Sequence, residues 1–446
     1  MDYIIKNGTV VNEGAIVKRD LFIHDGRIVE DSATLRNPQL FSAEDCYVLP
    51  GVIDTHVHFR DPGFPDKADF ATESHAALAG GVTSVIDMPN TKPQTTTVAD
   101  LEAKEQIAAQ KSAVNYGFML GATNDNIDEL LAIDPLRYAA IKLFLGSSTG
   151  NMLVNKADVL DKLFSQSRKL IVAHCEDEGI IQANMRNFKM EFAGKEGEEA
   201  SLHPKIRSRE ACFVSTYKAV ERARKYNTRL HIAHVSTATE LSLFSNMPLQ
   251  QKNITAEVTP NHLWFDDRDY AELGNKIKCN PAIKSNDDRL ALWGGLFDGV
   301  LDTIATDHAP HTLAEKEQRY FDAPGGIPSI QHSLQMMVEG FFNPTVYQRE
   351  DYDDLLKEWL PLIVTKMCHN PAEIFGIADR GYIRPGYYAD LVILQSGDTV
   401  ITRDSLLYKC GWSPLEGKTL HTRIRQVFLN GMPSGQSTAM PLKFIK

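Results

Sequence analysis

The chain has 446 residues, of which 43% are hydrophobic and 24% are charged, a composition typical of soluble globular proteins. This length exceeds one minimal domain and is sufficient to bury a large core. The formal net charge is -11 and no basic cluster occurs, which argues against nucleic acid and anionic membranes as partners.

No apolar run approaches the roughly 20 residues that a membrane-spanning helix needs. Residues 1–6 lack the charged lead and the apolar core of a signal peptide, so we expect none. The six cysteines are scattered and form no Cys-x-x-Cys motif, which favours reduced thiols. We therefore expect a cytoplasmic protein.

Both ends of the chain predict β-structure. Asn7-Gly8 and Asp25-Gly26 each lie between apolar segments, and both dipeptides suit hairpin turns with positive φ. Further strands are expected at 389–394 and 425–429, and Asn430-Gly431 follows the second of these. The two ends predict one small β-sandwich domain made of residues 1–49 and 380–446, and two unrelated flaps are the alternative.

Residues 50–379 alternate predicted strands with predicted helices. The expected strands are 48–58, 83–88, 114–120, 138–145, 170–174, 230–235, 254–258 and 303–305. The expected helices include 70–79, 98–111, 156–167, 207–226, 237–245 and 287–296. Eight such units fit a TIM-type (β/α)8 barrel of an α/β protein, whose usual size is about 250 residues. An open doubly wound sheet is the alternative, but no Gly-x-Gly-x-x-Gly follows a strand, which weakens a dinucleotide-binding version.

Two further segments stand out within this region. Residues 182–204 are highly charged and contain glycine, and we expect an excursion or lid near the fifth strand. Residues 320–328 are rich in proline and glycine and predict a loop after the eighth strand.

His56 and His58 lie two residues apart at the end of the first predicted strand. Because side chains alternate along a strand, both rings point the same way, and Arg60 follows if the extended run continues. Two imidazoles on one face form half of a metal site, although two surface or core histidines can have the same spacing. An arginine just beyond them is suited to bind an anion.

Other ligand-type residues lie on or at the ends of later strands. In a barrel, catalytic groups come from the carboxyl ends of several strands. Lys142 lies on the fourth strand, His174 and His234 end the fifth and sixth, and Asp307 ends the eighth. Four histidines and an aspartate at one rim predict a metal site.

Three other histidines receive no ligand role. His231 lies on the opposite face of its strand from His234, and we interpret it as structural. His262 and His308 are candidates for contacts with the ligands or the substrate.

These motifs resemble the amidohydrolase superfamily and, within it, dihydroorotases of the bacterial barrel type, over nearly the whole chain. The matching motifs are GVIDTHVHFRDPG (51–63), MPNT (88–91), IKLF (141–144), AHCE (173–176), HIAHVS (231–236), CNP (279–281) and ATDHAPH (305–311). GYIRPG at 381–386 is a general mark of the superfamily, whereas the RDPG end of the first motif is quite specific to dihydroorotases.

The resemblance implies a centre of two zinc ions. His56 and His58 would bind the first ion, and His174 and His234 would bind the second. Lys142 would bridge them as a carbamate, because an ammonium cannot ligate a cation whereas a neutral buried amine can add carbon dioxide. Some dihydroorotases of this type have aspartate at the bridging position, so Lys142 implies the carbamate version. Zinc suits the histidine-rich set, and manganese or cobalt would also fit.

The resemblance also implies the reaction. Metal-bound hydroxide would attack the ring amide carbonyl of dihydroorotate, giving N-carbamoyl-L-aspartate. Asp307 would contact the first metal and act as the catalytic general base, and it would deliver the proton to the leaving nitrogen. The reverse reaction would serve pyrimidine (UMP) biosynthesis.

Substrate-binding roles follow from the same resemblance. Arg60, Asn90 and His311 would bind the substrate carboxylate, and Asn280 would contact the ring. The backbone of residues 325–326, Gly325 and Gly326, would line the ring, where other members often have a bulkier residue before the glycine. A homodimer is suggested at the family level.

Two rival interpretations stay open. One is another cyclic-amide hydrolase, namely a hydantoinase, dihydropyrimidinase or allantoinase, most of which lack the arginine two residues after the second histidine. The other is a non-catalytic homologue that acts as a scaffold or assembly partner, although such relatives typically lose ligands.

Overall fold

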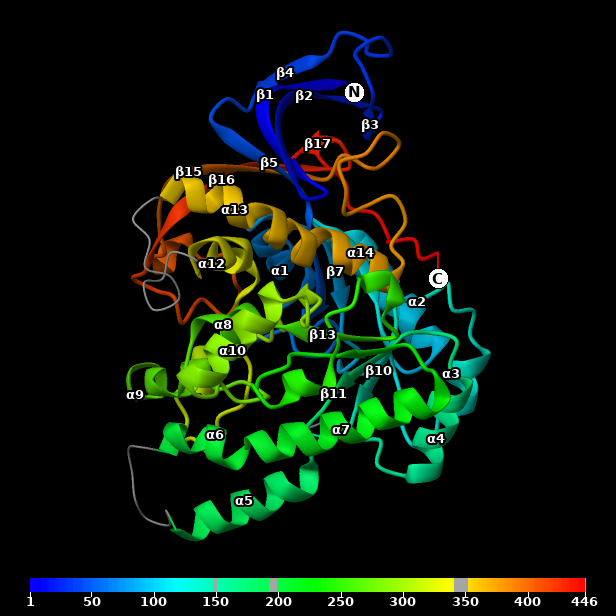
Figure 1. The fold of residues 1–446 in the computed structure, drawn as a ribbon, viewed down its shortest axis with the longest axis vertical. Coiled ribbons are helices and arrows are strands. Elements are labelled where there is room, and N and C mark those ends of the chain that lie inside the picture. Colours follow the sequence, from blue (N-terminus) through cyan, green and yellow to red (C-terminus); the bar gives the residue numbers. More distant parts are fainter. Residues whose placement is uncertain (147–150, 192–198, 341–351, 446) are drawn as a thin grey trace.

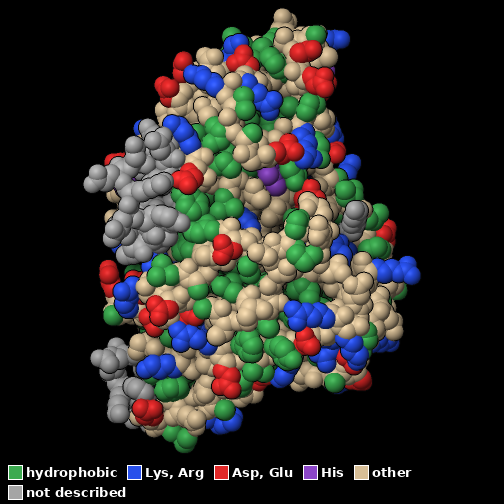
Figure 2. Space-filling view, in the orientation of Figure 1, with side chains coloured by type: hydrophobic (Ala, Val, Ile, Leu, Met, Phe, Trp, Pro, Cys, Tyr) green, Lys and Arg blue, Asp and Glu red, His purple; other side chains and the backbone are tan. Residues whose placement is uncertain are grey.

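The computed structural model describes residues 1–146, 151–191, 199–340 and 352–445 (Figure 1). An α/β barrel forms most of the molecule, and a smaller β-structure lies at one end of it (Figure 1). Among the described residues, no helix combines the length and the hydropathy that crossing a bilayer requires. All six cysteines are free thiols. On the face shown in Figure 2, positive and negative side chains are mixed over the visible described surface.

Parallel strands form the barrel. Its eight positions are occupied by β6 (Val52–Val57), β7 (Val82–Asp87), β8 (Asn115–Phe118) together with β9 (Leu120–Gly121), β10 (Ile141–Phe144), β11 (Ile171–His174), β12 (Leu230–Ile232), β13 (Ile254–Val258) and β14 (Thr303–Ile304). The last position returns to the first, because Val57 bridges His308 in parallel and the His58 N–H donates to the His308 carbonyl at 2.8 Å. The predicted TIM-type barrel is therefore confirmed, and the open sheet is wrong.

Helices cover the outside of the barrel (Figure 1). The helices are α1 (Phe70–Ala79), α2 (Val98–Lys111), α3 (Ile127–Ala132), α4 (Ala157–Gln166), α5 (Glu178–Glu191), α6 (His203–Ile206), α7 (Arg209–Tyr226), α8 (Pro260–Trp264), α9 (Tyr270–Leu273), α10 (Asn286–Phe297), α11 (Leu313–Lys316), α12 (Ser333–Gly340), α13 (Tyr352–Val364) and α14 (Asn370–Phe375). The helix expected at 237–245 is wrong, since only a 3₁₀ turn, Glu240–Leu243, forms there. The excursion expected at 182–204 begins within α5, and its residues 192–198 lie outside the described residues.

Strands from both ends of the chain form one eight-stranded sheet. Its members are β1 (Tyr3–Asn12), β2 (Ala15–His24), β3 (Arg27–Val29), β4 (Gln39–Ser42), β5 (Cys46–Pro50), β15 (Leu391–Val400), β16 (Thr419–Leu429) and β17 (Met432–Pro433). Ile5, Val48, Ile393 and Phe428 are buried in a core of its own. The joint β-sandwich is therefore confirmed over two separate flaps, and the division of the chain at residues 49 and 380 stays a prediction.

Two local expectations are corrected. The single strand expected at 48–58 is two strands, because β5 pairs with β15 in the terminal sheet while β6 pairs with β7 in the barrel. Asn7-Gly8 is not a hairpin turn, because β1 continues through it with a shift of register between Ile5 and Gly8. The turn lies at Glu13 and Gly14, whose φ values are 51° and 77°. Positive φ at Asn7 therefore marks a bulge within the strand.

The other two hairpin expectations are confirmed. Asp25-Gly26 joins β2 to β3, and Asn430-Gly431 joins β16 to β17. All four of these residues have positive φ, as a turn of this type requires. The last residues of the chain leave the terminal sheet, and Pro441 bridges Tyr116 of β8 in the barrel.

Candidate functional site

A cavity of about 250 Å³ opens at the carboxyl ends of the barrel strands. All twelve predicted site residues line it, together with Phe144, Ala309 and Pro324; the twelve are His56, His58, Arg60, Asn90, Lys142, His174, His234, Asn280, Asp307, His311, Gly325 and Gly326. A larger cavity of about 790 Å³ lies between residues 130–141 and 165–169, at the amino ends of β10 and β11. In barrels of this type the chemistry takes place at the carboxyl ends, so the smaller cavity is the candidate site.

His56 and His58 leave β6 with their rings directed at one carboxylate. His56 Nδ1 contacts Glu257 Oε1 at 2.7 Å, and His58 Nδ1 contacts Asn90 Oδ1 at 2.8 Å. These oxygens are acceptors, so each Nδ1 carries the proton and each Nε2 is left as a ligand atom. The two Nε2 atoms lie 3.3 Å and 3.0 Å from Asp307 Oδ1. Ligating histidines are commonly oriented by a hydrogen bond of this kind on the other ring nitrogen.

A second group gathers around Lys142 on β10. His174 Nδ1 lies 2.9 Å from His234 Nε2, and His174 Nε2 contacts Glu176 Oε2 at 3.0 Å. His234 Nδ1 and Lys142 Nζ are buried and have no hydrogen-bond partner within the described parts of the chain. Buried polar atoms are normally paired, so these two atoms indicate a site that is completed by a further group.

The charge states suit cation binding. Burial lowers the pKa of His58 to about 4 and the pKa of Lys142 to about 8. Burial alone would raise the pKa of Asp307, but the adjacent His56 and His58 hold it well below its usual range. A neutral imidazole and an ionised carboxylate are the forms that ligate metals, so little deprotonation is needed for binding.

The donor set fits a divalent transition metal. One ligand atom from each of His56, His234 and Asp307 can be chosen so that all lie within 4.8 Å of one another. Two further histidines adjoin this group: His58 contacts Asp307, and His174 contacts His234. Several imidazoles with a carboxylate are typical ligands of zinc and its first-row neighbours.

Arg60 lies on the other side of the cavity. Its Nε donates to the Pro310 carbonyl at 3.2 Å, and its Nη2 lies 3.0 Å from His311 Nε2. Among the described residues, no carboxylate forms an ion pair with this guanidinium. Burial of the ring lowers the pKa of His311 far below its usual value, and the positive charges of Arg60 and Lys67 lower it further. The wall therefore presents a half-buried guanidinium to the cavity, which suits binding of an anionic group.

The two glycines of the cavity wall lie where side chains do not fit. A Cβ on Gly325 would be 2.8 Å from Asn280 Nδ2. Gly326 has φ of 150°, and a Cβ added there would clash with the Ala309 carbonyl oxygen. The Asn280 Oδ1 atom is buried without a hydrogen-bond partner within the described ranges. A bulkier residue at the position of Gly325, which the family resemblance leads us to expect in other members, would require this wall to shift.

Three residues of the cavity have a left-handed backbone. The φ values are 64° at Arg60, 37° at His234 and 48° at Asp307. Such conformations are uncommon outside glycine and cluster at functional sites, where surrounding contacts stabilise them.

Sequence reasoning missed the carboxylates that support the ligands. Glu257 Oε1 accepts from His56 Nδ1 and from the His234 N–H. Glu176 accepts from His174 and pairs with Arg207, and these contacts hold its pKa at about 2 against the effect of burial. The sequence did offer one indication of Glu257. It is the only charged residue of the apolar strand β13, and a buried charge needs partners.

The three histidines without a ligand role are held by other groups. His231 Nδ1 contacts Thr255 Oγ1 at 2.8 Å, and His262 Nδ1 contacts Thr259 Oγ1 at 2.8 Å. His308, which follows Asp307, has a hydrogen bond on each of its two ring nitrogens. Its Nδ1 accepts from the Ser329 N–H at 3.1 Å, so Nε2 carries the proton and donates to Glu73 Oε2 at 2.8 Å.

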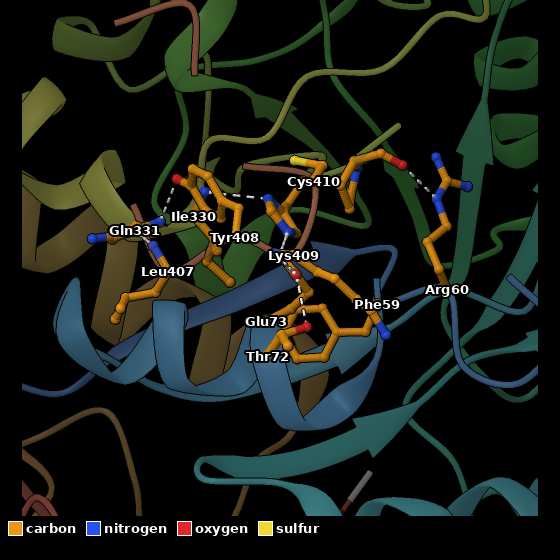
Figure 3. Close-up of polar contacts among 12 residues, drawn as sticks. Phe59, Arg60, Thr72, Glu73, Ile330, Gln331, Leu407, Tyr408, Lys409 and Cys410 are labelled. Carbon is orange, nitrogen blue, oxygen red and sulfur yellow. Dashed lines mark hydrogen bonds and ion pairs between the residues drawn. The ribbon is translucent and has the colours of Figure 1, made fainter. Parts of the chain in front are cut away.

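Glu73 joins the barrel to a distant segment of the chain. Its Oε1 accepts from the Lys409 N–H at 3.0 Å and from Thr72 Oγ1 at 2.9 Å (Figure 3). Tyr408 lies beside these residues, and its hydroxyl accepts from the Gln331 N–H at 2.9 Å (Figure 3). Residues from three separated parts of the sequence therefore hold the segment that carries Asp307.

Glu73→Gln is expected to destabilise the protein by about 1–3 kcal/mol, the typical cost of leaving a buried polar group unpaired. The amide would place an N–H group against either His308 or the Lys409 N–H, and His308 cannot change its tautomer while Ser329 donates to Nδ1. A lower Tm in thermal melts checks this. Lys409→Ala is the matched control, because it removes only the surface ion pair with Asp69 and keeps the N–H. Equal Tm values for the two variants would contradict the account.

Comparison with known proteins agrees with the fold and identifies the family. The model of the Amidohydrolase family matches residues 47–432. A dihydroorotase from Halobacterium salinarum is 33% identical over 417 residues, which cover 90% of this chain and 92% of that protein. An allantoinase from Escherichia coli is 30% identical over 445 residues, covering 96% and 94%. The structure of L-hydantoinase (dihydropyrimidinase) from Arthrobacter aurescens superposes with a TM-score of 0.89 at 25% identity, covering 99% of each chain. The chain therefore belongs to the amidohydrolase family.

Proposed function

We propose that this protein is a dihydroorotase, which reversibly hydrolyses the cyclic amide of (S)-dihydroorotate to N-carbamoyl-L-aspartate in pyrimidine biosynthesis. The observation that carries the proposal is Arg60, a half-buried guanidinium on the cavity wall that contacts His311 and Pro310. Dihydroorotate has a carboxylate beside its ring amide, whereas hydantoin, dihydrouracil and allantoin have none. The similarity to dihydroorotases over most of the chain supports the same choice.

We assign the metal ligands as follows. His56, His58 and Asp307 would hold one divalent cation, His174 and His234 would hold a second, and Lys142 would bridge them after carboxylation. The neutral Lys142 amine would add carbon dioxide and lose a proton, which gives an anion with two ligand oxygens. Zinc is the metal that we propose, and when bound it would lower the pKa of water and polarise the amide carbonyl.

Asp307 is assigned as the general base and acid. As a bond forms between the water oxygen and the ring carbonyl carbon, Asp307 takes a proton from the water. As the carbon–nitrogen bond of the ring breaks, Asp307 gives this proton to the departing nitrogen. The same residue acts in reverse order when carbamoyl-aspartate closes to the ring and water leaves.

Substrate orientation is assigned to the opposite wall. Arg60 offers a planar pair of N–H donors that matches a carboxylate, and Asn90 and His311 would complete its binding. Asn280, whose Oδ1 has no hydrogen-bond partner among the described residues, and the backbone of Gly325 and Gly326 would contact the ring.

Arg60→Ala is expected to raise KM for dihydroorotate by about 10–100-fold, because a charge-assisted bidentate contact is lost. Bound metal should stay at the wild-type amount, since Arg60 contacts none of the assigned ligands. Steady-state kinetics and metal analysis of the same preparations measure both quantities. Arg137→Ala removes an exposed cation of a surface ion pair and serves as the control. Wild-type KM in the Arg60 variant would remove this residue from substrate binding.

The second candidate is hydrolysis of a neutral ring amide, which the likeness to the allantoinase and the L-hydantoinase favours. Rates with dihydroorotate, hydantoin, dihydrouracil and allantoin, measured before and after chelation, separate the two. A preference for any of the three neutral rings would overturn the proposal.

A further inference from the structure

Two lysines lie buried behind the cavity wall opposite the assigned metal ligands. Lys316 ends α11 and is 2% exposed, and Lys278 is 8% exposed. Within the described ranges, neither ammonium forms an ion pair with a carboxylate. Buried charges are normally paired, so an uncompensated pair of cations needs a reason.

Backbone carbonyls take the place of a counter-ion. Lys316 Nζ donates to the carbonyls of Lys278, Pro324 and Gly326 at 3.0, 3.0 and 2.9 Å. These three bonds use all the donors of one ammonium. Lys278 Nζ donates to the carbonyls of Tyr320 and Ala323. Four of the five acceptors belong to residues 320–326, the loop that ends in the cavity wall.

The same loop is tied to the residues beside the proposed ring site. The Gly326 N–H donates to the Lys278 carbonyl at 2.8 Å, so this oxygen accepts from both the loop and Lys316. Lys278 is followed by Cys279 and by Asn280, which lines the cavity. Because these carbonyls turn toward the ammonium groups, Lys316 orients the peptide groups of Pro324 and Gly326, and Lys278 orients those of Tyr320 and Ala323.

The positive charge also reaches the carboxylate side of the cavity. Lys316 is one of the cations, with Arg60 and Lys67, whose charge lowers the pKa of His311. The nearest acidic side chain in sequence, Glu315, pairs with Lys67 at 2.7 Å and acts on Lys316 only at longer range, without an ion pair in the described structure. Burial lowers the pKa of Lys316 to about 7, and an anion bound in the cavity would favour its charged form.

We propose that Lys316, supported by Lys278, is a positioning residue that makes the cavity favour ring amides bearing a carboxylate over neutral rings. It would do so by fixing the backbone of 324–326 and by adding positive potential behind Arg60. This inference rests on the proposed function, since it concerns the substrate of the same site.

The test uses two ring ligands that differ by one carboxylate, orotate and uracil. Their dissociation constants are measured by calorimetry on metal-loaded wild type, Lys316→Met and Lys316→Arg. We expect Lys316→Met to weaken orotate binding about tenfold more than uracil binding, because both rings lose the ordered wall but only orotate loses the added positive potential. Lys316→Arg keeps the charge and should recover most of the preference for orotate. An equal loss for both ligands in Lys316→Met, or no loss for either, would overturn the inference.

Lys366→Met is the matched control for burial. Lys366 is also a buried lysine whose Nζ donates to a backbone carbonyl, that of Leu301 at 2.6 Å, away from the cavity. Its loss should lower Tm without changing the ratio of orotate to uracil affinity. If Lys316→Met does not fold, Lys278→Met provides the same comparison with Lys316 in place. Turnover of dihydroorotate by wild type tests the proposed function separately, because the binding assay needs no turnover.

Discussion

Asp307→Asn is expected to lower kcat by about 10²–10⁴-fold, the range that a general acid–base group contributes. Asparagine keeps the size of the side chain but cannot take a proton from water or return it to nitrogen. The backbone at Asp307 has φ of 48°, a conformation that asparagine tolerates well, so the fold should persist. Hydrolysis rates, thermal melts and metal analysis of the same sample measure the effect.

Asp379→Asn is the matched control for this substitution. Asp379 also has a left-handed backbone, with φ of 55°, but it pairs with Arg27 at the surface. Its activity should equal that of wild type. Loss of kcat with metal retained in the Asp307 variant would support the base, and loss of both would support the ligand role. Wild-type turnover would exclude Asp307 from the chemistry.

Lys142→Met should remove nearly all activity while leaving the Tm of the metal-free protein unchanged or higher. Lys142 is fully buried and its Nζ has no hydrogen-bond partner in the described structure, so an apolar chain of similar length loses no hydrogen bond there. Removing an unpaired buried amine relieves a desolvation cost. If carboxylated Lys142 bridges two cations, the variant should bind fewer zinc equivalents than wild type, as metal analysis would show.

Dissolved carbon dioxide gives an independent check on the same residue. Apoprotein reconstituted with zinc should regain activity and full zinc content in bicarbonate buffer, and regain less in buffer depleted of carbon dioxide. The Lys142 variant should respond to neither condition. Full zinc content and activity in Lys142→Met would contradict the bridge.

The regular elements were largely predictable because their signals are local. Helices α1 and α2 have the predicted bounds, and each begins at a capping box, Asp69 with Thr72 and Thr97 with Asp100. The segment 237–245 also begins with such a cap, since the Glu240 N–H donates to Thr237 Oγ1 at 3.2 Å, yet it forms only a 3₁₀ turn, so a cap alone does not predict how far a helix continues. The rule that Asn-Gly predicts a hairpin turn fails at Asn7-Gly8. The positive φ that this dipeptide favours occurs there in a bulge within a strand, not in a turn.

The sequence by itself determined the barrel, the β-rich ends and the identities of the residues that line the cavity, because strand ends and motifs can be recognised from residues near one another. Only the tertiary structure decided how those residues are supported. The spacing of residues in the sequence does not predict three of these contacts: Glu257 with His56, Lys409 with Glu73, and Pro324 with Lys316. The physical reason is that a buried polar group must find a partner, and the folded chain alone determines which distant group lies within hydrogen-bond distance.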